Sequence, residues 1–394
     1  MTTCESCQLF GAYEALAGIR GSVVLLHSVT GCNFGTLTLD LLQHMNEINQ
    51  CCTVISDTDV IMGGENSVEA ALHSVWELYH PQAVFVISGC IANMIGDDIN
   101  SAIHLADLPC PVLHIPAPGF GGGIRKGYEM AAEALFSIME APSDKEHIHK
   151  KRVNIIGVGS GDWRVEADKK AIQRILPADV EIGMFFSCCT MEDVKKAAYS
   201  SLNLVFGQGI RLAQKMKKAY GIPYIELAYP YGITGEKSIG HALEELIGIP
   251  YEENKEQKKN IQSLKKMYTY LQALYGSSAA IIGSKSRALG MKQFLEEELG
   301  MDVVCFAIRD EIENLETFYD SLKRTEAALL FGSSFETSMA RKLELPLIRF
   351  DYPVFDRICI TEKPYAGSAG VPYLIEDILN EIFSEKKNEG ALYQ

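Results

Sequence analysis

The sequence lacks three features that would direct it to a membrane, to secretion or to a nucleic acid. It has no apolar run of about 18 residues, which excludes an ordinary membrane-spanning helix. Its first residues, MTTCESCQLFGAY, contain no basic stretch followed by an apolar one, so we expect a cytoplasmic protein without a signal peptide. Positive charge is also scarce, because 36 Lys and Arg against 51 Asp and Glu leave a net charge of −15. A basic face for a phosphate backbone is therefore not expected, and we expect neither a nucleic acid nor a membrane as a partner.

Cysteine, in contrast, is abundant. In a reducing compartment the 11 cysteines are expected to remain thiols, so a disulfide framework is not expected and metal binding or redox chemistry is favoured. Some are expected to be small core residues, because free cysteine is among the most buried residue types. We interpret Cys110, Cys305 and Cys359 in this way, since they lie in or beside apolar, strand-like runs.

Short apolar runs alternate with amphipathic segments along the whole chain, as in SVVLLH, AVFVIS, VNIIGVG, LNLVFG, AAIIG, DVVCFA and AALLFG. Unbroken apolar runs indicate strands buried on both faces, which predicts an α/β protein with parallel sheets flanked by helices. One strand–turn–helix–strand unit recurs three times, which predicts three Rossmann-like domains. Polar stretches suggest domain boundaries that give residues 1–148, 149–258 and 259–394, the last with a C-terminal helix.

Three cysteines are placed where a parallel sheet would bring them together. Cys7 precedes a helix-like segment, Cys32 follows the run SVVLLH, and Cys90 follows the run AVFVIS. If these strands are neighbours, Cys32 and Cys90 emerge at the same sheet edge, where open α/β sheets bind ligands. Three thiolates from separate loops are typical of a cluster or metal site rather than of a zinc knuckle, whose ligands come in tight pairs.

Three cysteines are one ligand short of the four that an iron–sulfur cube usually takes. Two sources of the fourth ligand stay open. Cys4, Cys51 and Cys52 are the candidates within this chain. A second subunit is the other source, if the site lies at an interface.

Other residues near these cysteines have two interpretations each. Gly31, Gly89 and the run 121–123 lack side chains, which would let backbone amides approach a cluster. His27 ends the first strand, where it either donates a hydrogen bond to a cluster or is a satisfied core histidine. The vicinal pair at 188–189 either packs in a turn or faces a central cavity.

Some residues imitate catalytic or nucleotide-binding motifs. Asp97 and Asp98 would point about 100° apart on a helix, so we expect structural roles rather than an acid–base pair. GVGSG is followed by Asp162 where a dinucleotide fingerprint requires its last glycine, which predicts a tight turn instead. GITGEKS has Glu236 where a phosphate loop requires glycine, and a carboxylate there would repel phosphate. We therefore expect this chain to bind no ATP.

Five segments in order and spacing resemble the nitrogenase component 1 family: CQLFGAYEALAGIRGSVVLLHSVTGC, DTDVIMGGENSVEAAL, VFVISGCIANMIGDDIN, PAPGFGGGIRKGY and PLIRFDYPVFDR. The likeness runs from Cys7 to Arg357 and is strongest to the β-type subunit of the molybdenum–iron protein. This resemblance implies that Cys7, Cys32 and Cys90 ligate an iron–sulfur cluster, of the 4Fe-4S or P-cluster kind. It also implies that the cluster is shared at an interface with a homologous component 1 subunit.

The sequence departs from the family where the molybdenum cofactor would bind. Gly207 stands where an α subunit has a cysteine ligand, and RFDYPVFDR contains no histidine ligand. Gly123 stands where the β subunit has a serine that can ligate the oxidised P-cluster. This chain alone is therefore not expected to reduce dinitrogen. Its length of 394 residues, short for a nitrogenase subunit, also favours a nitrogenase-like reductase.

The resemblance thus implies an oxidoreductase subunit that is active only in a complex. It would receive electrons from an ATP-dependent, iron-protein-type reductase and pass them to a small-molecule substrate or a second metallocluster. One alternative is a non-catalytic scaffold for metallocluster assembly. Another is a ligand-binding α/β protein whose thiols are only structural.

Overall fold

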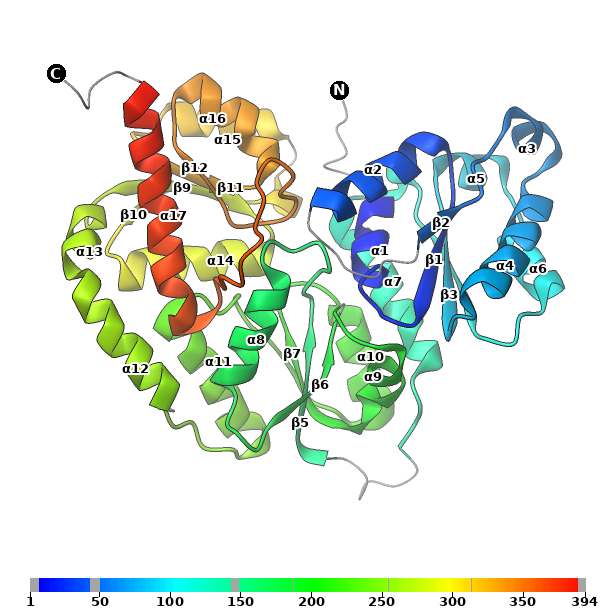
Figure 1. Cartoon of the computed structure of the whole chain (residues 1–394), viewed down its shortest axis with the longest axis horizontal. Coiled ribbons are helices and arrows are strands. Elements are labelled where there is room, and N and C mark those ends of the chain that lie inside the picture. Colours follow the sequence, from blue (N-terminus) through cyan, green and yellow to red (C-terminus); the bar gives the residue numbers. More distant parts are fainter. Residues whose placement is uncertain are drawn as a thin grey trace. The chain divides into compact units, whose positions relative to one another are not determined.

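The computed structural model describes residues 7–42, 50–142, 149–186, 188–253, 255–312 and 314–388. In these residues, three four-stranded parallel sheets are flanked by helices (Figure 1). This arrangement confirms the predicted α/β class with three Rossmann-like sheets.

The three sheets share one strand order, β2-β1-β3-β4, β6-β5-β7-β8 and β10-β9-β11-β12. In each sheet the last two strands of the order frame the repeated strand–turn–helix–strand unit, which explains the sequence repeat. The strands of the first sheet are β1 (Ser22–His27), β2 (Gln50–Cys52), β3 (Ala83–Ser88) and β4 (Val112–Pro116). Those of the second are β5 (His149–Ile156), β6 (Glu181–Phe185), β7 (Ser200–Val205) and β8 (Tyr224–Glu226). Those of the third are β9 (Ser278–Gly283), β10 (Asp302–Ile308), β11 (Leu329–Gly332) and β12 (Leu347–Arg349).

The chain divides into two compact units, Met1–Gly161 with Ile182–Tyr224, and Asp162–Glu181 with Ile225–Gln394. The three domain boundaries proposed from the sequence remain a prediction. Helices of the first unit are α1 (Gln8–Leu16), α2 (Thr30–Leu42), α3 (Asp57–Met62), α4 (Glu65–Tyr79), α5 (Cys90–Ile95), α6 (Ile99–Ala106), α7 (Ile124–Ala134), α9 (Met191–Lys195) and α10 (Ile210–Tyr220). Helices of the second unit are α8 (Val165–Ile175), α11 (Gly232–Ile247), α12 (Lys255–Leu264), α13 (Tyr268–Leu274), α14 (Lys285–Gln293), α15 (Leu315–Lys323), α16 (Thr337–Leu343) and α17 (Gly367–Asn388).

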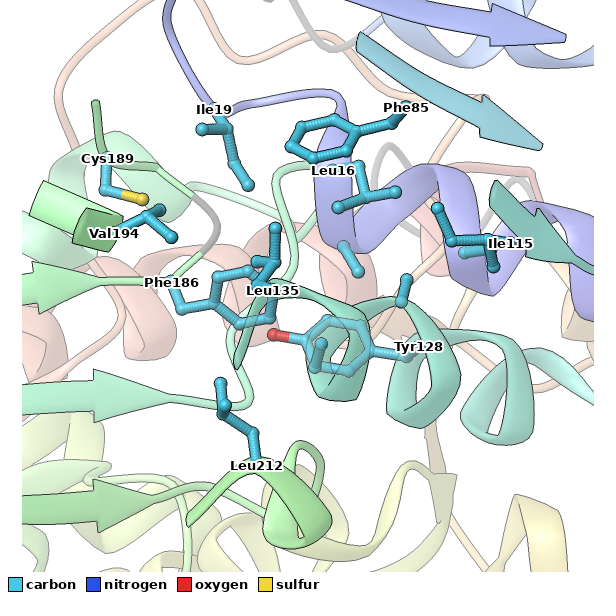
Figure 2. Close-up of a cluster of buried hydrophobic side chains, with 14 of the residues drawn as sticks. Leu16, Ile19, Phe85, Ile115, Tyr128, Leu135, Phe186, Cys189, Val194 and Leu212 are labelled. Atoms are coloured by element: carbon cyan, nitrogen blue, oxygen red, sulfur yellow. The ribbon is translucent and has the colours of Figure 1, made fainter. Parts of the chain in front are cut away.

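The first sheet is buried on both faces, which explains its unbroken apolar strands. Along β1, Val24 and Leu26 join one apolar cluster, whereas Val23 and Leu25 join another. The first cluster, which includes side chains of α1 and α7, is shown in Figure 2. The second cluster includes side chains of α4 and α6. Successive strand residues thus point to opposite faces, each covered by its own helices.

Helices α1 and α7 pack with their backbones in close approach. A Cβ on Gly11 would lie 1.8 Å from the carbonyl oxygen of Ile124, and one on Gly127 would lie 1.9 Å from that of Gln8. Only glycine fits at either position, because any side-chain carbon would overlap the facing helix. This contact fixes the start of α1, where Cys7 lies.

The two nucleotide-like motifs have structural roles. Gly157 has φ +97°, as expected of a tight turn. The Asp162 carboxylate forms an ion pair at 3.1 Å with Arg287. GITGEKS forms the first turns of α11, and buried Glu236 accepts a hydrogen bond from the Ser368 N–H at 2.7 Å. Among the described helices, none combines the length and the apolarity that a bilayer crossing requires.

Two of the three cysteines interpreted as core residues pack as predicted. Cys305 is buried in an apolar cluster of the second unit, and Cys110 packs against the α4/α6 cluster. The interpretation is wrong for Cys359, which lies between the exposed side chains of Ile358 and Ile360. Its thiol donates a hydrogen bond to the Thr361 carbonyl at 3.3 Å.

Candidate metal centre

Cys32 and Cys90 leave the first sheet at the same edge. Strands β1 and β3 are parallel neighbours, with His27 beside Ser88 at their carboxyl ends. Cys32 then lies in the first turn of α2, and Cys90 is the first residue of α5. Cys7 directly precedes α1. All three cysteines are partly exposed.

Gly119 lies between the sulfurs of Cys7 and Cys90. Its N–H donates a hydrogen bond to the Cys90 Sγ at 3.1 Å. A Cβ on Gly119 would lie 3.2 Å from the Cys7 Sγ and 3.3 Å from the Cys90 Sγ, so the two sulfurs are no further apart than the sum of these distances. The missing side chain leaves room beside both sulfurs, as a bound group would require.

Cys32 and Cys90 both act electrostatically on Cys7. Burial raises the pKa of the Cys7 thiol, and the Leu9 and Phe10 N–H groups at the start of α1 oppose that rise. Repulsion from Cys32 and Cys90 raises the same pKa further, because like charges disfavour the thiolate form of Cys7. A bound cation would reverse this repulsion and hold the sulfurs as thiolates.

This donor set fits a cluster better than a single ion. Across the described ranges, no three His, Cys, Asp or Glu side chains are close enough to hold one metal ion. A cluster of several irons and sulfides spans thiolates that are further apart. The donors near Gly119 are all sulfur, which suits iron–sulfur clusters.

The core interpretation of His27 is confirmed. Its ring pairs through Nδ1 with the Thr53 hydroxyl at 2.9 Å and through Nε2 with Asp97 at 2.8 Å. The other Asp97 oxygen accepts from the Gly64 N–H at 2.9 Å, and the His27 and Asp97 side chains are both fully buried. Asp98 instead caps α6 by accepting from the Ser101 N–H. The two aspartates therefore have structural roles, as predicted.

A second histidine, the half-buried His114, should make stability depend on pH. The ring of His114 pairs with the Ser88 hydroxyl at 2.8 Å, and burial, aided by the charge of His27, lowers its pKa from 6.5 to about 4. Between these values the unfolded chain binds a proton that the folded chain does not, so stability falls as pH drops from 6.5 towards 4. We expect a loss of about 2 kcal/mol, allowing for the part of the ring that contacts water.

Urea unfolding of His114→Gln at several pH values checks this expectation. The variant should lose part of the acid destabilisation that we expect for the natural protein. His104→Gln, which changes an exposed histidine on α6, serves as the control and should keep it. Identical pH profiles for both variants would contradict a depressed pKa at His114.

The glycine at the site is not one of those proposed from the sequence. Gly31 has open space around its Cα, and a Cβ on Gly89 would meet the Ser28 hydroxyl at 2.2 Å rather than a sulfur. Within the run 121–123, a Cβ on Gly121 would meet Gln8. Gly119 was missed, although its position in the turn PAPGF directly after β4 is a usable signal.

The remaining cysteines differ in burial and in the sheet face on which they lie. Cys4 lies outside the described residues. Cys188 and Cys189 are buried, and Cys189 packs in the α1/α7 cluster (Figure 2), which agrees with a packed turn. Cys51 and Cys52 end strand β2 on opposite faces of the sheet.

Comparison with known proteins assigns the chain to a family. The family model described as nitrogenase component 1 type oxidoreductase matches residues 7–383. A nitrogenase iron-molybdenum cofactor biosynthesis protein NifE of Clostridium pasteurianum is 29% identical over 318 residues, covering 76% of this chain and 67% of that protein. The NifE of Bradyrhizobium diazoefficiens is 26% identical, and the match spans 64% of its length.

Other relatives match over more of their length. A nitrogenase molybdenum-iron protein beta chain of Rippkaea orientalis is 24% identical over 441 residues, covering 97% of this chain and 83% of that one. A solved structure, "Nitrogenase Cp1 at pH 6.5", shares the fold with a TM-score of 0.83 and 20% identity, covering 99% of this chain and 94% of its own. The family resemblance of the sequence is thereby confirmed, and this chain belongs to the nitrogenase component 1 type oxidoreductase family.

Proposed function

We propose that this chain is the iron–sulfur subunit of a two-component, nitrogenase-like reductase in the cytoplasm. The supporting observation is the approach of Cys7 and Cys90 to Gly119, with Cys32 within electrostatic range. Cys7, Cys32 and Cys90 would hold the cluster, and the Gly119 N–H would stabilise the sulfur of Cys90. Such a cluster supplies low-potential, single-electron transfer. The chain's own part is to shield the sulfurs and to hold them in place.

Exposed apolar side chains support the docking of a protein partner near the cysteines. They belong to α2, α3, α5 and the Gly119 turn, the segments that carry or flank the cysteines. Their exposure runs from 66% to 80%, and all of them lie in segments that follow the carboxyl ends of the strands of the first sheet, which supports an interaction surface at that edge. We name this group the docking rim; it consists of Phe34, Ile61, Met62, Met94 and Phe120. An ATP-dependent, iron-protein-type reductase is the proposed partner, and a homologous component 1 subunit is the second.

The scaffold alternative has its own supporting observation. Two relatives are named as cofactor biosynthesis proteins NifE, one of them 29% identical to this chain. A scaffold would use the same cysteines to hold a metallocluster during assembly. The two functions differ in turnover, because a scaffold transfers its cargo once whereas a reductase passes electrons repeatedly.

The cluster itself is tested by purification without oxygen. We expect a brown protein with about four irons per chain and a paramagnetic signal after reduction. Cys90→Ala should lose most of this iron, whereas Cys110→Ala, a matched change against the α4/α6 cluster, should keep it. A folded natural protein that is colourless and free of iron would contradict the proposal.

The reductase and scaffold functions are then separated by a partner assay. The anoxic protein is mixed with an iron-protein-type reductase and ATP, and the cluster signal is followed over time. A reductase subunit should be reduced repeatedly whenever an electron acceptor is added. Loss of iron to a cofactor-free acceptor protein, without repeated reduction, would favour the scaffold.

A further inference from the structure

The adjacent cysteines at the end of β2 lie on different faces of the first sheet. Cys51 pairs with Leu25 of β1 and packs against the α4/α6 cluster. Cys52 pairs with Leu26 and packs against the α1/α7 cluster, as Cys7 and Cys32 do. Of the two, only Cys52 shares a sheet face with the candidate metal centre.

Cys52 also lies at the correct end of the sheet. It is the last residue of β2, which runs parallel to β1 as its immediate neighbour (Figure 1). The carboxyl ends of β1 and β3 at the same edge lead into Cys32 and Cys90. Four cysteines from four separate segments therefore lie at the carboxyl edge of one sheet.

The backbone after Cys52 is bent to place an amide against its sulfur. Val54 has φ +54°, a left-handed conformation that is strained for a β-branched residue. Its N–H lies 3.4 Å from the Cys52 Sγ. The turn is fixed by two further hydrogen bonds, from the Thr53 N–H to Leu26 and from the Ile55 N–H to Ser28. An N–H aimed at sulfur favours a thiolate, and the Gly119 N–H does the same at Cys90.

Charge repulsion links Cys52 to the same group of thiols. Burial raises the pKa of Cys52, the Val54 N–H opposes the rise, and repulsion from Cys32 and Cys51 adds to it. Cys32 thus acts electrostatically on both Cys7 and Cys52. The thiol of Cys52 lies 3.7 Å from the Ser28 carbonyl, a weak contact that ligation would replace. Cys51 is instead paired with the Tyr79 hydroxyl.

We propose that Cys52 is the fourth thiolate ligand, so that this chain alone completes the set for a four-iron cluster. The inference rests on the proposed iron–sulfur function and goes beyond it, because it assigns the fourth ligand to this chain rather than to a second subunit. The chain then binds its cluster with Cys7, Cys32, Cys52 and Cys90, and a homologous subunit is not needed to complete it.

Anoxic purification of Cys52→Ala, with Cys51→Ala as the neighbouring control, tests this assignment. Iron and sulfide per chain, the paramagnetic spectrum and the native mass are measured for both and for Cys90→Ala. We expect Cys52→Ala to lose at least half of its iron, as Cys90→Ala does, while Cys51→Ala keeps the natural content. Cys52→Ser, which keeps the side-chain volume and offers an oxygen ligand, should retain iron with an altered spectrum.

The outcomes separate this inference from the proposed function. If Cys52→Ala and Cys52→Ser keep the natural iron and spectrum while Cys90→Ala loses them, the fourth ligand is not Cys52 and the cluster proposal stands. If the natural protein holds no iron, both fail. If Cys52→Ala without iron unfolds at a lower temperature than Cys51→Ala, the Cys52→Ser variant decides the question. An unaltered paramagnetic spectrum of Cys52→Ser overturns the assignment, and an altered spectrum supports it.

Discussion

Gly11→Ala is expected to destabilise the first unit by about 3 kcal/mol and to remove most of the bound iron. The new Cβ would lie 1.8 Å from the Ile124 carbonyl oxygen, a backbone atom that cannot rotate away. Helix α1 must therefore move off α7. Cys7 directly precedes α1, so its sulfur moves away from Gly119 and Cys90.

Thermal unfolding and iron content measure the two effects of Gly11→Ala. Gly127→Ala should have the same two effects, because its Cβ on α7 would meet the Gln8 carbonyl of α1. Gly123→Ala is the control, since a Cβ there meets nothing within 4 Å, and its expected change, from the less favourable N-cap of α7, is at most about 1 kcal/mol. Equal melting of Gly11→Ala and Gly123→Ala would contradict the close approach of the two helices.

The sheet edge that carries the site could be predicted from the sequence. Unbroken apolar runs identify buried parallel strands, and the residues that follow such strands lie at their carboxyl ends. This reasoning placed Cys32 and Cys90 at one edge, and the pairing of β1 with β3 bears it out. The threefold repeat likewise predicted three sheets, which share one strand order.

The sheet face on which each cysteine lies could not be predicted in the same way. Adjacent strand residues point to opposite faces, so Cys51 and Cys52 had to differ. Which of them shares a face with Cys7 depends on which helices cover that face, and the sequence does not encode this locally. Gly119 was missed for a similar reason, since its role arises only when β4 lies beside β3.

Ion pairs between residues far apart in the chain also could not be predicted from the sequence. Asp162 excluded a dinucleotide fingerprint, but nothing nearby in the chain indicated its partner. The structure pairs it with Arg287 of α14. Both side chains are buried, and a buried charge is tolerated only when it is paired.

This buried pair leads to the second large expected effect, in Arg287→Met. The guanidinium lies 3.1 Å from Asp162 and 3.9 Å from the centre of the Tyr229 ring, and it is only 3% exposed. It also lowers the pKa values of Asp168 and Asp351, which burial raises. Removing the cation takes away the ion pair of Asp162 and part of the compensation of Asp168 and Asp351, at an expected cost of about 4 kcal/mol.

The pH dependence of that loss identifies its cause. Without Arg287, the folded-state pKa of Asp168 should rise further above its ordinary value of 3.8, so the folded chain binds a proton that the unfolded chain lacks. A group of this kind regains stability as pH falls through its raised pKa towards 3.8. The deficit of Arg287→Met relative to the natural protein should therefore shrink from pH 7 to about pH 4. Lys292 lies on α14 like Arg287, but it is exposed, and its ammonium lies 3.9 Å from Glu296. The Lys292→Met variant should therefore lose less than about 0.5 kcal/mol of stability at every pH. A deficit for Arg287→Met that stays constant with pH would mean that lost packing, rather than unpaired buried charge, destabilises the variant.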